Sequence, residues 1–400
     1  MFKSSQALSK LTVLELGSTI AGPFCGRLLA DFGAQVIKVE DPAGDVLRNM
    51  GEIVNGKSLH AASLLRNKLV VAADLRTAGG RDVVKRLAAK SDILIENFRP
   101  GALEKWGLGY EDLSKINPGL VMVRISGYGQ TGPYSARPGY GVISEATSGL
   151  RYINGYPDVP PARMGTPLTD YITGLYAAFG ALVALVERGL SGRGQVIDAA
   201  LYESAFSFME SFVPAYDKLG LVPERTGSKL PGAAPNNLYV TADGQYILIA
   251  AWADSLFRRF CNAIGMPALA DDARFDAVKS RAKNSDELDD IISAWTLSLP
   301  LLEIERVLGV SEIPASRIFS MADIFKDPHY QARQAIVRVQ DDALGEVALA
   351  APVPRLSRTP GEIKHAGHMK GQDTIEVLSR FGFTPKEIDS LVGDGSVQVG

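Results

Sequence analysis

The stretch Leu11–Glu40, LTVLELGSTIAGPFCGRLLADFGAQVIKVE, decides how the chain begins to fold. Leu11–Leu16 is a short apolar run typical of a buried strand, and Gly17 ends it. Pro23 suits the first turn of a helix whose apolar residues recur at helical spacing. Gln35–Val39 is a second apolar run. This strand–helix–strand order predicts two parallel strands joined by a crossover helix.

The same alternation continues outward along the chain. Leu69–Ala73, Asp92–Ile95 and Leu120–Ile125 read as further strands. We therefore expect an α/β fold with a mostly parallel sheet and helices on both of its faces. The apolar run Tyr171–Val186 predicts a buried helix, and GRGQVIDAAL after it predicts a strand followed by a long amphipathic helix to about Leu219.

The character of the sequence changes near residue 220, where VPERTGSKLPGAAPNN is rich in Pro, Gly and Asn. YVTADGQYILIAA follows with an Asp-Gly turn signal and predicts a β-hairpin. We expect residues 1–220 to form the N-terminal part of a large domain and 225–325 to form a smaller domain. Residues 330–400, with short strands and two helices, are expected to return to the large domain.

Composition excludes several classes of function. The chain has 400 residues with 42 Lys and Arg against 45 Asp and Glu, so bulk attraction to nucleic acid or to an anionic membrane is not expected. The two cysteines, Cys25 and Cys261, are far apart and form no metal-binding motif. No apolar leader is visible, and the longest apolar run is shorter than the ~20 residues that span a bilayer. A cytoplasmic location is expected.

Two sequence motifs for familiar chemistries are weak or missing. Gly127–Gly132 matches GxGxxG after a strand, but Pro133 and Pro138 follow where a nucleotide-binding motif would open a helix. We interpret these glycines as a tight loop. The four histidines, at positions 60, 329, 365 and 368, leave the centre of the chain without an imidazole. A histidine-based hydrolase is therefore disfavoured.

Asp170 is the residue with the most chemical promise. It stands at the start of the apolar helix, in PLTDYITGLYAAF. One interpretation is a structural aspartate that stabilises the helix N-terminus. The other is an ionised carboxylate beside apolar walls, available as a nucleophile. The residues alone leave both interpretations open.

Ligand-binding residues are expected where parallel strands end, because ligands of open α/β sheets bind at that edge. The loop Ser18–Phe24 lies between a strand and a helix, and Asn97, Phe98 and Arg99 follow another strand. An amide, an aromatic ring and a cation suit a nucleotide base with phosphates. Further cations occur near strand ends at Lys38, Arg66, Lys68, Lys105 and Arg137.

Together these segments resemble the class III CoA-transferase family, which includes formyl-CoA transferase, carnitine CoA-transferase and α-methylacyl-CoA racemase. The resemblance covers nearly the whole chain. It rests on the ordered set of the opening stretch, RNKLVVAADL, ENFRPGALEKWGLGYEDL, GYGQTGPYSARPGYGVISEATSG, PLTDYITGLYAAFGALVALVERGLSGRGQVIDAAL and PNNLYVTADGQYILIAAW.

The resemblance implies a Rossmann-like large domain with an inserted smaller domain, and two chains interlocked as an obligate homodimer. Acyl-CoA and a carboxylic acid are the implied substrates, without a prosthetic group or a metal. The family's catalytic aspartate falls on Asp170. The implied CoA contacts are Asn97 and Phe98 for the adenine end, and Lys68, Lys105 and Arg137 for the phosphates and pantetheine.

The implied reaction is nucleophilic catalysis by Asp170, through an aspartyl anhydride and an aspartyl-CoA thioester. Two alternatives remain. A racemase of 2-methylacyl-CoA is disfavoured, because Tyr140 stands where that branch carries a histidine, and a tyrosine is a far weaker base. A catalytically silent CoA-binding paralogue is the other alternative.

Two departures bear on the substrate. The stretch Lys229–Pro235 has one glycine where formyl-CoA transferases carry a run of glycines, and Asp41 stands where some members place a basic residue. The overall pattern looks closest to branches that use succinyl-CoA and small dicarboxylic acids. Arg48, Arg151 and Arg163 are the candidate cations for a distal carboxylate.

Overall fold

The computed structural model describes residues 6–400, and the chain forms two compact units. The first unit contains the chain up to Leu150 together with Met164–Lys218 and Gln331–Gly400. The second contains Arg151–Arg163 and Leu219–Tyr330. Each unit has hydrophobic clusters of its own.

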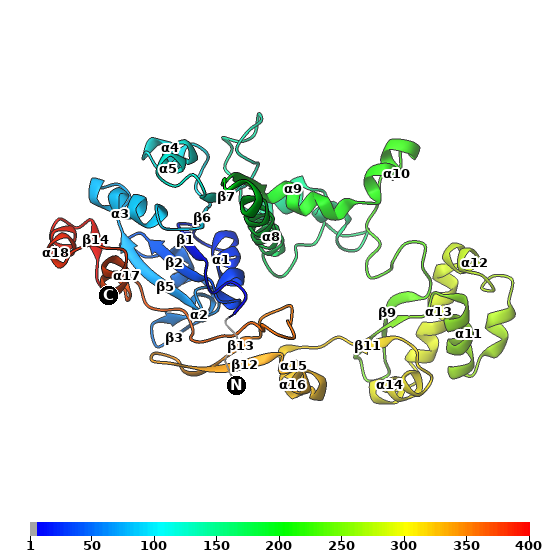
Figure 1. The fold of residues 1–400 in the computed structure, drawn as a ribbon. Coiled ribbons are helices and arrows are strands. Elements are labelled where there is room, and N and C mark those ends of the chain that lie inside the picture. The colour runs from blue at the N-terminus through cyan, green and yellow to red at the C-terminus, as the bar shows by residue number, and fades with distance from the viewer. Residues whose placement is uncertain (1–5) are drawn as a thin grey trace. The chain divides into compact units, whose positions relative to one another are not determined.

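The first unit is built on a seven-stranded sheet in the order β14-β5-β2-β1-β6-β7-β8 (Figure 1). All neighbouring strands are parallel except β14, which runs antiparallel to β5. The order reverses between β1 and β6, as in doubly wound nucleotide-binding sheets, and loops diverge there at the carboxyl ends of the strands. The strands are β1 Thr12–Glu15, β2 Gln35–Glu40, β5 Lys68–Ala73, β6 Ile93–Glu96, β7 Val121–Ser126, β8 Val196–Ala200 and β14 Val397–Gln398.

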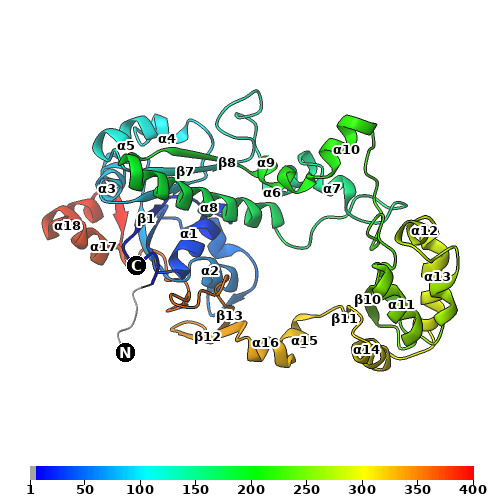
Figure 2. The same ribbon diagram turned by 45° about the vertical axis from the view of Figure 1, so that its right-hand side comes forward.

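Helices cover both faces of this sheet, as the α/β class requires (Figures 1 and 2). Helices α1 (Ala21–Asp31) and α8 (Leu168–Ser191) share one hydrophobic cluster with one face of the strands. Helices α3 (Ala78–Ala88), α5 (Tyr110–Ile116) and α17 (Thr374–Arg380) share another cluster with the opposite face. The expected α/β fold with a mostly parallel sheet is confirmed.

The remaining elements of the first unit are short. They are η1 Val46–Asn49, β3 Ile53–Val54, β4 Lys57–Ser58, α2 Leu59–Leu64, α4 Ala102–Lys105, α6 Gly141–Thr147, α9 Leu201–Phe206, η2 Ser207–Met209, β12 Ile336–Asp341, β13 Gly345–Ala350 and α18 Pro385–Gly393. Three further elements cross the unit boundaries, namely α7 Leu150–Ile153, α10 Phe212–Leu219 and α16 Pro328–Ala332. The predicted long helix to Leu219 is wrong, because it is broken into α9, η2 and α10. Pro214 has no backbone N–H for a continuous helix to use.

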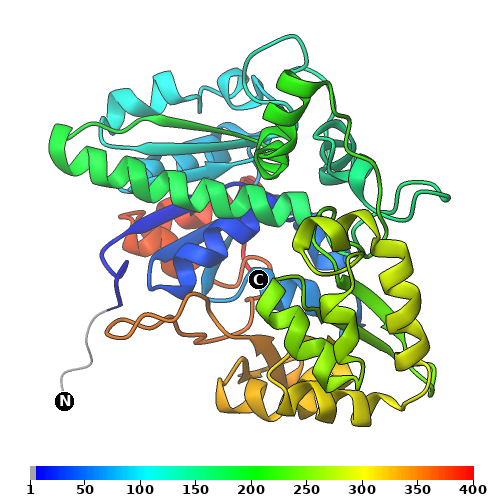
Figure 3. The ribbon, with the colours of Figure 1, turned by 90° about the vertical axis from the view of Figure 1, so that its right-hand side faces the viewer.

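Helix α8 is only half in the core, which corrects the expectation of a buried helix. Its sheet-facing residues are small, and a Cβ on Gly174 would lie 2.8 Å from the Ala21 carbonyl oxygen, so α1 and α8 pack closely. Its other face is apolar and exposed, with Leu175, Phe179, Val183, Val186 and Leu190 at helical spacing. By length and composition α8 is a candidate membrane span, with 39% of its most apolar stretch buried. Figure 3 shows it as the long green helix.

The second unit packs helices against a three-stranded antiparallel sheet in the order β11-β10-β9 (Figure 3). The predicted hairpin is confirmed as β9 (Asn236–Val240) and β10 (Tyr246–Ala250). The other elements are α11 Asp254–Ala263, η3 Pro267–Asp271, α12 Val278–Lys283, α13 Ser285–Thr296, α14 Leu301–Val310, β11 Ala315–Arg317 and α15 Met321–Lys326.

Candidate active site

The candidate site lies at the point where the strand order reverses. There the side-chain amide of Asn97 joins the loop after β6 to the loop after β1. Ser18 N donates to Asn97 Oδ1 at 2.7 Å, and Asn97 Nδ2 donates to the Ser18 carbonyl oxygen at 2.8 Å. Asn97, which was expected to contact a ligand, therefore also fixes the shape of the floor on which a ligand would lie.

A cavity of about 210 Å3 opens above this pair of hydrogen bonds. It is lined by residues of the first unit, namely Ser18–Ala21, Asn97–Pro100, Ile125–Gly127, Ser135, Arg137–Tyr140, Asp170 and Leu201. Four of the six predicted site residues thus come together, namely Asn97, Phe98, Arg137 and Asp170. Arg137 lies with its guanidinium carbon 3.6 Å from the centre of the Tyr134 ring, which holds the cation at the cavity wall.

Asp170 has the properties of a reactive carboxylate. It lies in the first turn of α8, directly after the N-cap region at Pro167. Burial raises its pKa to about 6, while a hydrogen bond from its own backbone N–H acts in the opposite direction. The group is therefore mostly ionised at neutral pH, yet it is poorly solvated and has no ion-pair partner within residues 6–400. That combination suits a nucleophile better than a structural cap.

Space for this carboxylate is made by Gly141, the first residue of α6. A Cβ on Gly141 would lie 1.9 Å from Asp170 Oδ2 and 2.7 Å from Thr169 Oγ1. Thr169 Oγ1 donates a hydrogen bond to the Gly141 carbonyl oxygen at 2.9 Å, so the start of α6 is tied to the start of α8. Tyr140, which caps α6, lines the same cavity and is 71% exposed.

A second cavity of about 300 Å3 adjoins the first and shares Ser18 and Phe98 with it. It lies over the carboxyl ends of β1, β2 and β5, and its wall includes Trp106 and Arg76. Phe98 and Trp106 pack edge to face with their ring centres 5.6 Å apart. The Arg76 guanidinium is exposed and pairs with Asp74 at 2.7 Å and Asp41 at 3.2 Å. An aromatic corner beside a solvated cation suits a nucleotide.

The two predicted lysines are placed differently. Lys105 is exposed at the end of α4, next to Trp106, but does not line either cavity. Lys68 is completely buried, and its ammonium bonds to Glu15 Oε2 at 2.6 Å and to the Pro23 carbonyl oxygen at 2.7 Å. This burial does not fit a contact between Lys68 and a phosphate, because Glu15 and the Pro23 carbonyl oxygen keep the ammonium group inside the protein.

The arginines expected to bind a distal carboxylate do not line the cavity that contains Asp170. Arg48 makes two hydrogen bonds to Glu40, at 2.6 and 2.7 Å. Arg151 and Arg163 belong to the second unit. A different cation, Arg27 of α1, lines a third hollow together with His60 and Tyr171, the residue directly after Asp170.

The structure also adds site residues that the sequence did not single out. Gly141, Arg76 and Trp106 fall into this group, and only their positions just after strands or at a helix start hinted at them. The glycines of Gly127–Gly132 form a loop rather than a helix start, as expected, since α6 begins only at Gly141. Within residues 6–400, no group of three or more His, Cys, Asp or Glu is arranged to hold a metal ion.

A doubly wound sheet whose switch point holds a half-buried carboxylate beside an aromatic, cation-bearing groove defines a nucleotide-ligand enzyme of the α/β class. Comparison with known proteins identifies the family. The profile of CoA-transferase family III matches residues 8–374. The chain belongs to this family, and it is a class III CoA-transferase.

Individual relatives agree over almost the full length. Succinyl-CoA–D-citramalate CoA-transferase of Chloroflexus aurantiacus is 48% identical over 387 residues, which cover 96% of each chain. Succinate–glutarate CoA-transferase of Agrobacterium fabrum is 36% identical, over 93% of this chain and 95% of its own. The crystal structure of a CAIB/BAIF family protein from Brucella suis superposes with a TM-score of 0.85 at 33% identity, covering 94% of this chain and 100% of its own.

Proposed function

We propose that the chain transfers CoA from succinyl-CoA to a small dicarboxylic acid, with Asp170 as the nucleophile. The observation that carries the proposal is the ionisable, half-buried Asp170 in a cavity at the sheet's switch point. The two relatives described above are named for succinyl-CoA or succinate, and for citramalate or glutarate, which are both dicarboxylic acids.

The first half of the reaction converts Asp170 into a thioester. An Oδ atom of Asp170 attacks the thioester carbon of succinyl-CoA, the carbon–sulfur bond breaks, and an aspartyl-succinyl anhydride forms with release of CoA thiolate. The thiolate then attacks the aspartyl carbon of the anhydride. Succinate leaves as a carboxylate, and Asp170 holds CoA as a thioester.

The second half runs the same steps in reverse with the acceptor. A carboxylate oxygen of the acceptor acid attacks the aspartyl-CoA carbon and releases the thiolate, which gives a new anhydride. The thiolate attacks the acceptor's acyl carbon, and Asp170 returns as a free carboxylate. The free energy of the thioester is kept throughout, and half-burial of Asp170 supports exclusion of the water that would hydrolyse the intermediates.

Negative charge develops on a carbonyl oxygen in each step, and backbone N–H groups stabilise such charge when they are already in position. Ile20 and Ala21 stand at the start of α1 and line the cavity with Asp170. Their N–H groups have no hydrogen-bond acceptor among residues 6–400. We assign them the role of oxyanion donors.

The aromatic corner of Phe98 and Trp106 supports binding of the adenine end of CoA in the second cavity. Arg76 and Lys105 near it and Arg137 in the first cavity are the cations proposed to bind phosphates and pantetheine. Asn97 lines the first cavity and holds the backbone of Ser18, which lines both cavities. Lys68 drops out of this set because it is buried.

Arg27 is proposed as the cation for a distal carboxylate. Its side chain is only 14% exposed, and Nε makes no hydrogen bond, with Asp31 Oδ2 3.7 Å away. Burial and the nearby Arg66 lower the pKa of Arg27 to about 10, so it stays charged at neutral pH. A buried cation without a full set of acceptors is costly unless an anion joins it. Tyr171, His60 and the acidic Glu52 are among the other residues that line the hollow.

The remaining features of the proposal concern assembly and location. The second unit is proposed to be the inserted small domain, near the expected 225–325, with residues 1–220 and 330–400 contributing the large one. We propose that a second copy of this chain covers the apolar outer face of α8 in an interlocked homodimer. No prosthetic group, nucleic acid or membrane partner is proposed, and the location is proposed to be cytoplasmic.

A substrate panel tests the function. Succinyl-CoA is incubated with malate, citramalate, glutarate, itaconate and matched monocarboxylates, and the new CoA thioesters are quantified. We expect transfer to dicarboxylates and none after Asp170→Ala. Transfer to monocarboxylates alone contradicts the substrate class, and deuterium uptake at the α-carbon of a 2-methylacyl-CoA without transfer indicates the racemase instead. A fully folded protein without either reaction indicates a silent CoA-binding paralogue.

A further inference from the structure

The loop between β1 and α1 contains a residue in an unfavourable backbone conformation. Thr19 has φ of +68°, in the left-handed region that a β-branched residue rarely adopts. Thr19 lines the cavity that contains Asp170 and directly precedes Ile20 and Ala21. Such a conformation persists only where surrounding contacts hold it, so the contacts of this loop carry information about the site.

Asp45 supplies those contacts. Its Oδ1 accepts a hydrogen bond from Thr19 N at 3.0 Å and another from Leu47 N at 2.9 Å. Asp45 comes from the segment after β2, so it reaches the loop from a neighbouring strand end. One carboxylate oxygen therefore fixes the direction of the Thr19 peptide.

Lys38 also holds both Asp45 and the loop in place. Its ammonium lies 2.8 Å from Asp45 Oδ2 and donates to the Gly17 carbonyl oxygen. Burial alone would raise the pKa of Asp45, but Lys38 and the hydrogen bonds from Leu47 and Thr19 lower it below its usual range. Burial opposes the charge of Lys38, and Asp45 and Glu15 nevertheless raise its pKa. Both groups are thus charged inside the protein at neutral pH.

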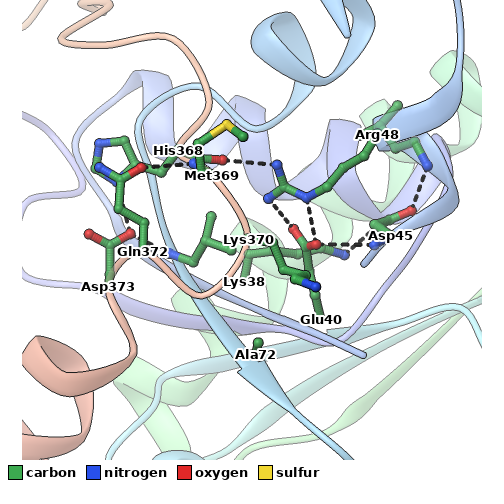
Figure 4. Close-up of polar contacts among 12 residues, drawn as sticks. Lys38, Glu40, Asp45, Arg48, Ala72, His368, Met369, Lys370, Gln372 and Asp373 are labelled. Atoms are coloured by element: carbon green, nitrogen blue, oxygen red, sulfur yellow. Dashed lines mark hydrogen bonds and ion pairs between the residues drawn. The ribbon is translucent and has the colours of Figure 1, made fainter. Parts of the chain in front are cut away.

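The position of Asp45 is fixed further by a second ion pair, between Glu40 and Arg48 (Figure 4). Asp45 N donates to Glu40 Oε2 at 3.0 Å, and Glu40 binds the guanidinium of Arg48. Arg48 Nη1 in turn donates to the carbonyl oxygen of His368 at 3.1 Å, in the C-terminal segment. The chain of contacts from Thr19 to His368 therefore leaves Asp45 little freedom to move.

As a consequence, neighbouring N–H groups of this loop differ in whether they already have a hydrogen-bond acceptor. The N–H groups of Ser18 and Thr19 are occupied by Asn97 and Asp45. Those of Ile20 and Ala21 have no acceptor among the described residues. If Thr19 relaxed to a negative φ, the peptide before Ile20 would rotate and these donors would change direction.

We infer that Asp45 and Lys38 are positioning residues for the N–H donors that serve Asp170. This inference rests on the proposed function, because it assumes that a carbonyl oxygen on or near Asp170 gains charge during the reaction. Neither side chain needs to touch the substrate. Their contribution is to hold the loop in the strained form before the substrate arrives.

The test uses Asp45→Ala and Asp45→Asn in the full-length protein. The alanine variant removes the acceptor for Thr19 N. Asparagine keeps an oxygen there, but it loses the charge and presents a donor in place of the acceptor that faces Lys38. We expect kcat to fall about 100-fold for Asp45→Ala, as for a misplacement near 1 Å, with KM for acyl-CoA within about threefold. Asp45→Asn is expected to recover at least about tenfold of that loss.

Asp341→Asn is the matched control. The side chain of Asp341 is 8% exposed, accepts hydrogen bonds from the backbone N–H groups of Ala343 and Leu344, and pairs with the buried Lys57. No hydrogen bond or ion pair among the described residues joins it to the Gly17–Ile20 loop. If the effect on kcat is merely destabilisation, Asp341→Asn lowers the melting temperature and kcat as Asp45→Asn does, and the inference is overturned. It is also overturned if folded Asp45→Ala keeps kcat within threefold, or if only KM changes.

Asp170→Asn, assayed in parallel, separates the inference from the proposed function. An active Asp170→Asn enzyme overturns the proposed nucleophile and, with it, the premise of this inference. An inactive Asp170→Asn enzyme with a fully active, folded Asp45→Ala variant overturns the positioning role alone. Should Asp45→Ala not fold, Asp45→Asn with the kcat and KM measurements decides the question by itself.

Discussion

Gly141 and Asp170 lie so close that any side chain at position 141 would occupy the space of the carboxylate. A Cβ built on Gly141 stands 1.9 Å from Asp170 Oδ2, well inside the contact distance of the two atoms. The pair joins the first residue of α6 to the first turn of α8. The orientation of the proposed nucleophile therefore depends on a residue that has no functional group of its own.

Gly141→Ala is expected to lower kcat about 100-fold or more, because the carboxylate has to move aside and loses its alignment. KM for acyl-CoA should change little, since the second cavity is untouched. Steady-state kinetics of the purified variant give both values. Gly189→Ala is the matched control, as it lies in α8 with open space around its Cα. Full activity of Gly141→Ala would show that Asp170 reacts from another rotamer.

The pH dependence of transfer follows from the raised pKa of Asp170. Only the carboxylate form attacks a thioester, and burial raises the pKa of this group to about 6. We expect kcat/KM to rise with pH through about 6 and to level off above about 7. A stopped assay between pH 5 and 8.5, with a control for enzyme stability at each pH, measures the profile. A flat profile down to pH 5 contradicts the assignment.

Asp170→Asn is expected to stabilise the folded protein at pH 8. The carboxyl binds its proton more tightly in the folded state than in the unfolded chain, so the ionised form opposes folding at pH values above about 6. At 1.36 kcal/mol per pKa unit, the shift from 3.8 to about 6 corresponds to a gain of about 3 kcal/mol. Thermal unfolding at pH 8 should show a rise in the melting temperature of a few degrees.

The same linkage sets the control for that measurement. Below pH 4 the aspartate is protonated in both the folded and the unfolded chain, so the advantage of asparagine should disappear there. A stabilisation that persists unchanged to pH 3.5 would point to a cause other than the burial of charge.

Arg27→Gln is expected to raise KM for dicarboxylate acceptors about tenfold or more, the effect of losing a charge-assisted hydrogen bond. Transfer to monocarboxylates should stay unchanged. Arg338→Gln serves as the control, because Arg338 is exposed in β12 and pairs with Glu346 of the neighbouring strand. A change in subunit assembly without a change in KM would mean that an acidic group of a partner subunit, and not the substrate, completes this hollow.

The sequence alone carried much of the fold because the parallel strands are buried on both faces. Runs such as Gln35–Val39 and Leu120–Ile125 are mostly apolar, and strands formed there within a residue or two of the expected bounds. Strand β14 was not expected, since two residues are too few to show a pattern. The helix to Leu219 was overextended, because apolar periodicity outweighed Pro214.

The site was predictable only in part, and for a physical reason. Asp170 stood out because a carboxylate at the start of an apolar helix can be recognised from the sequence alone. The burial of Lys68 could not be predicted from the sequence, because its partner Glu15 lies on another strand and the two come together only when the sheet forms. Gly141 could not be singled out, since its importance is the space it leaves open.

The pairing of β14 with β5 has a consequence for biosynthesis. Val397 pairs with Ala73, so an inner strand made early is completed by a segment that is translated long after it. Until residue 398 leaves the ribosome, one hydrogen-bonding edge of β5 stays open and competent for pairing with another nascent chain. The Arg48–His368 contact likewise joins an early segment to a late one. The contacts that hold the strained loop beside Asp170 are therefore complete only after translation has passed His368.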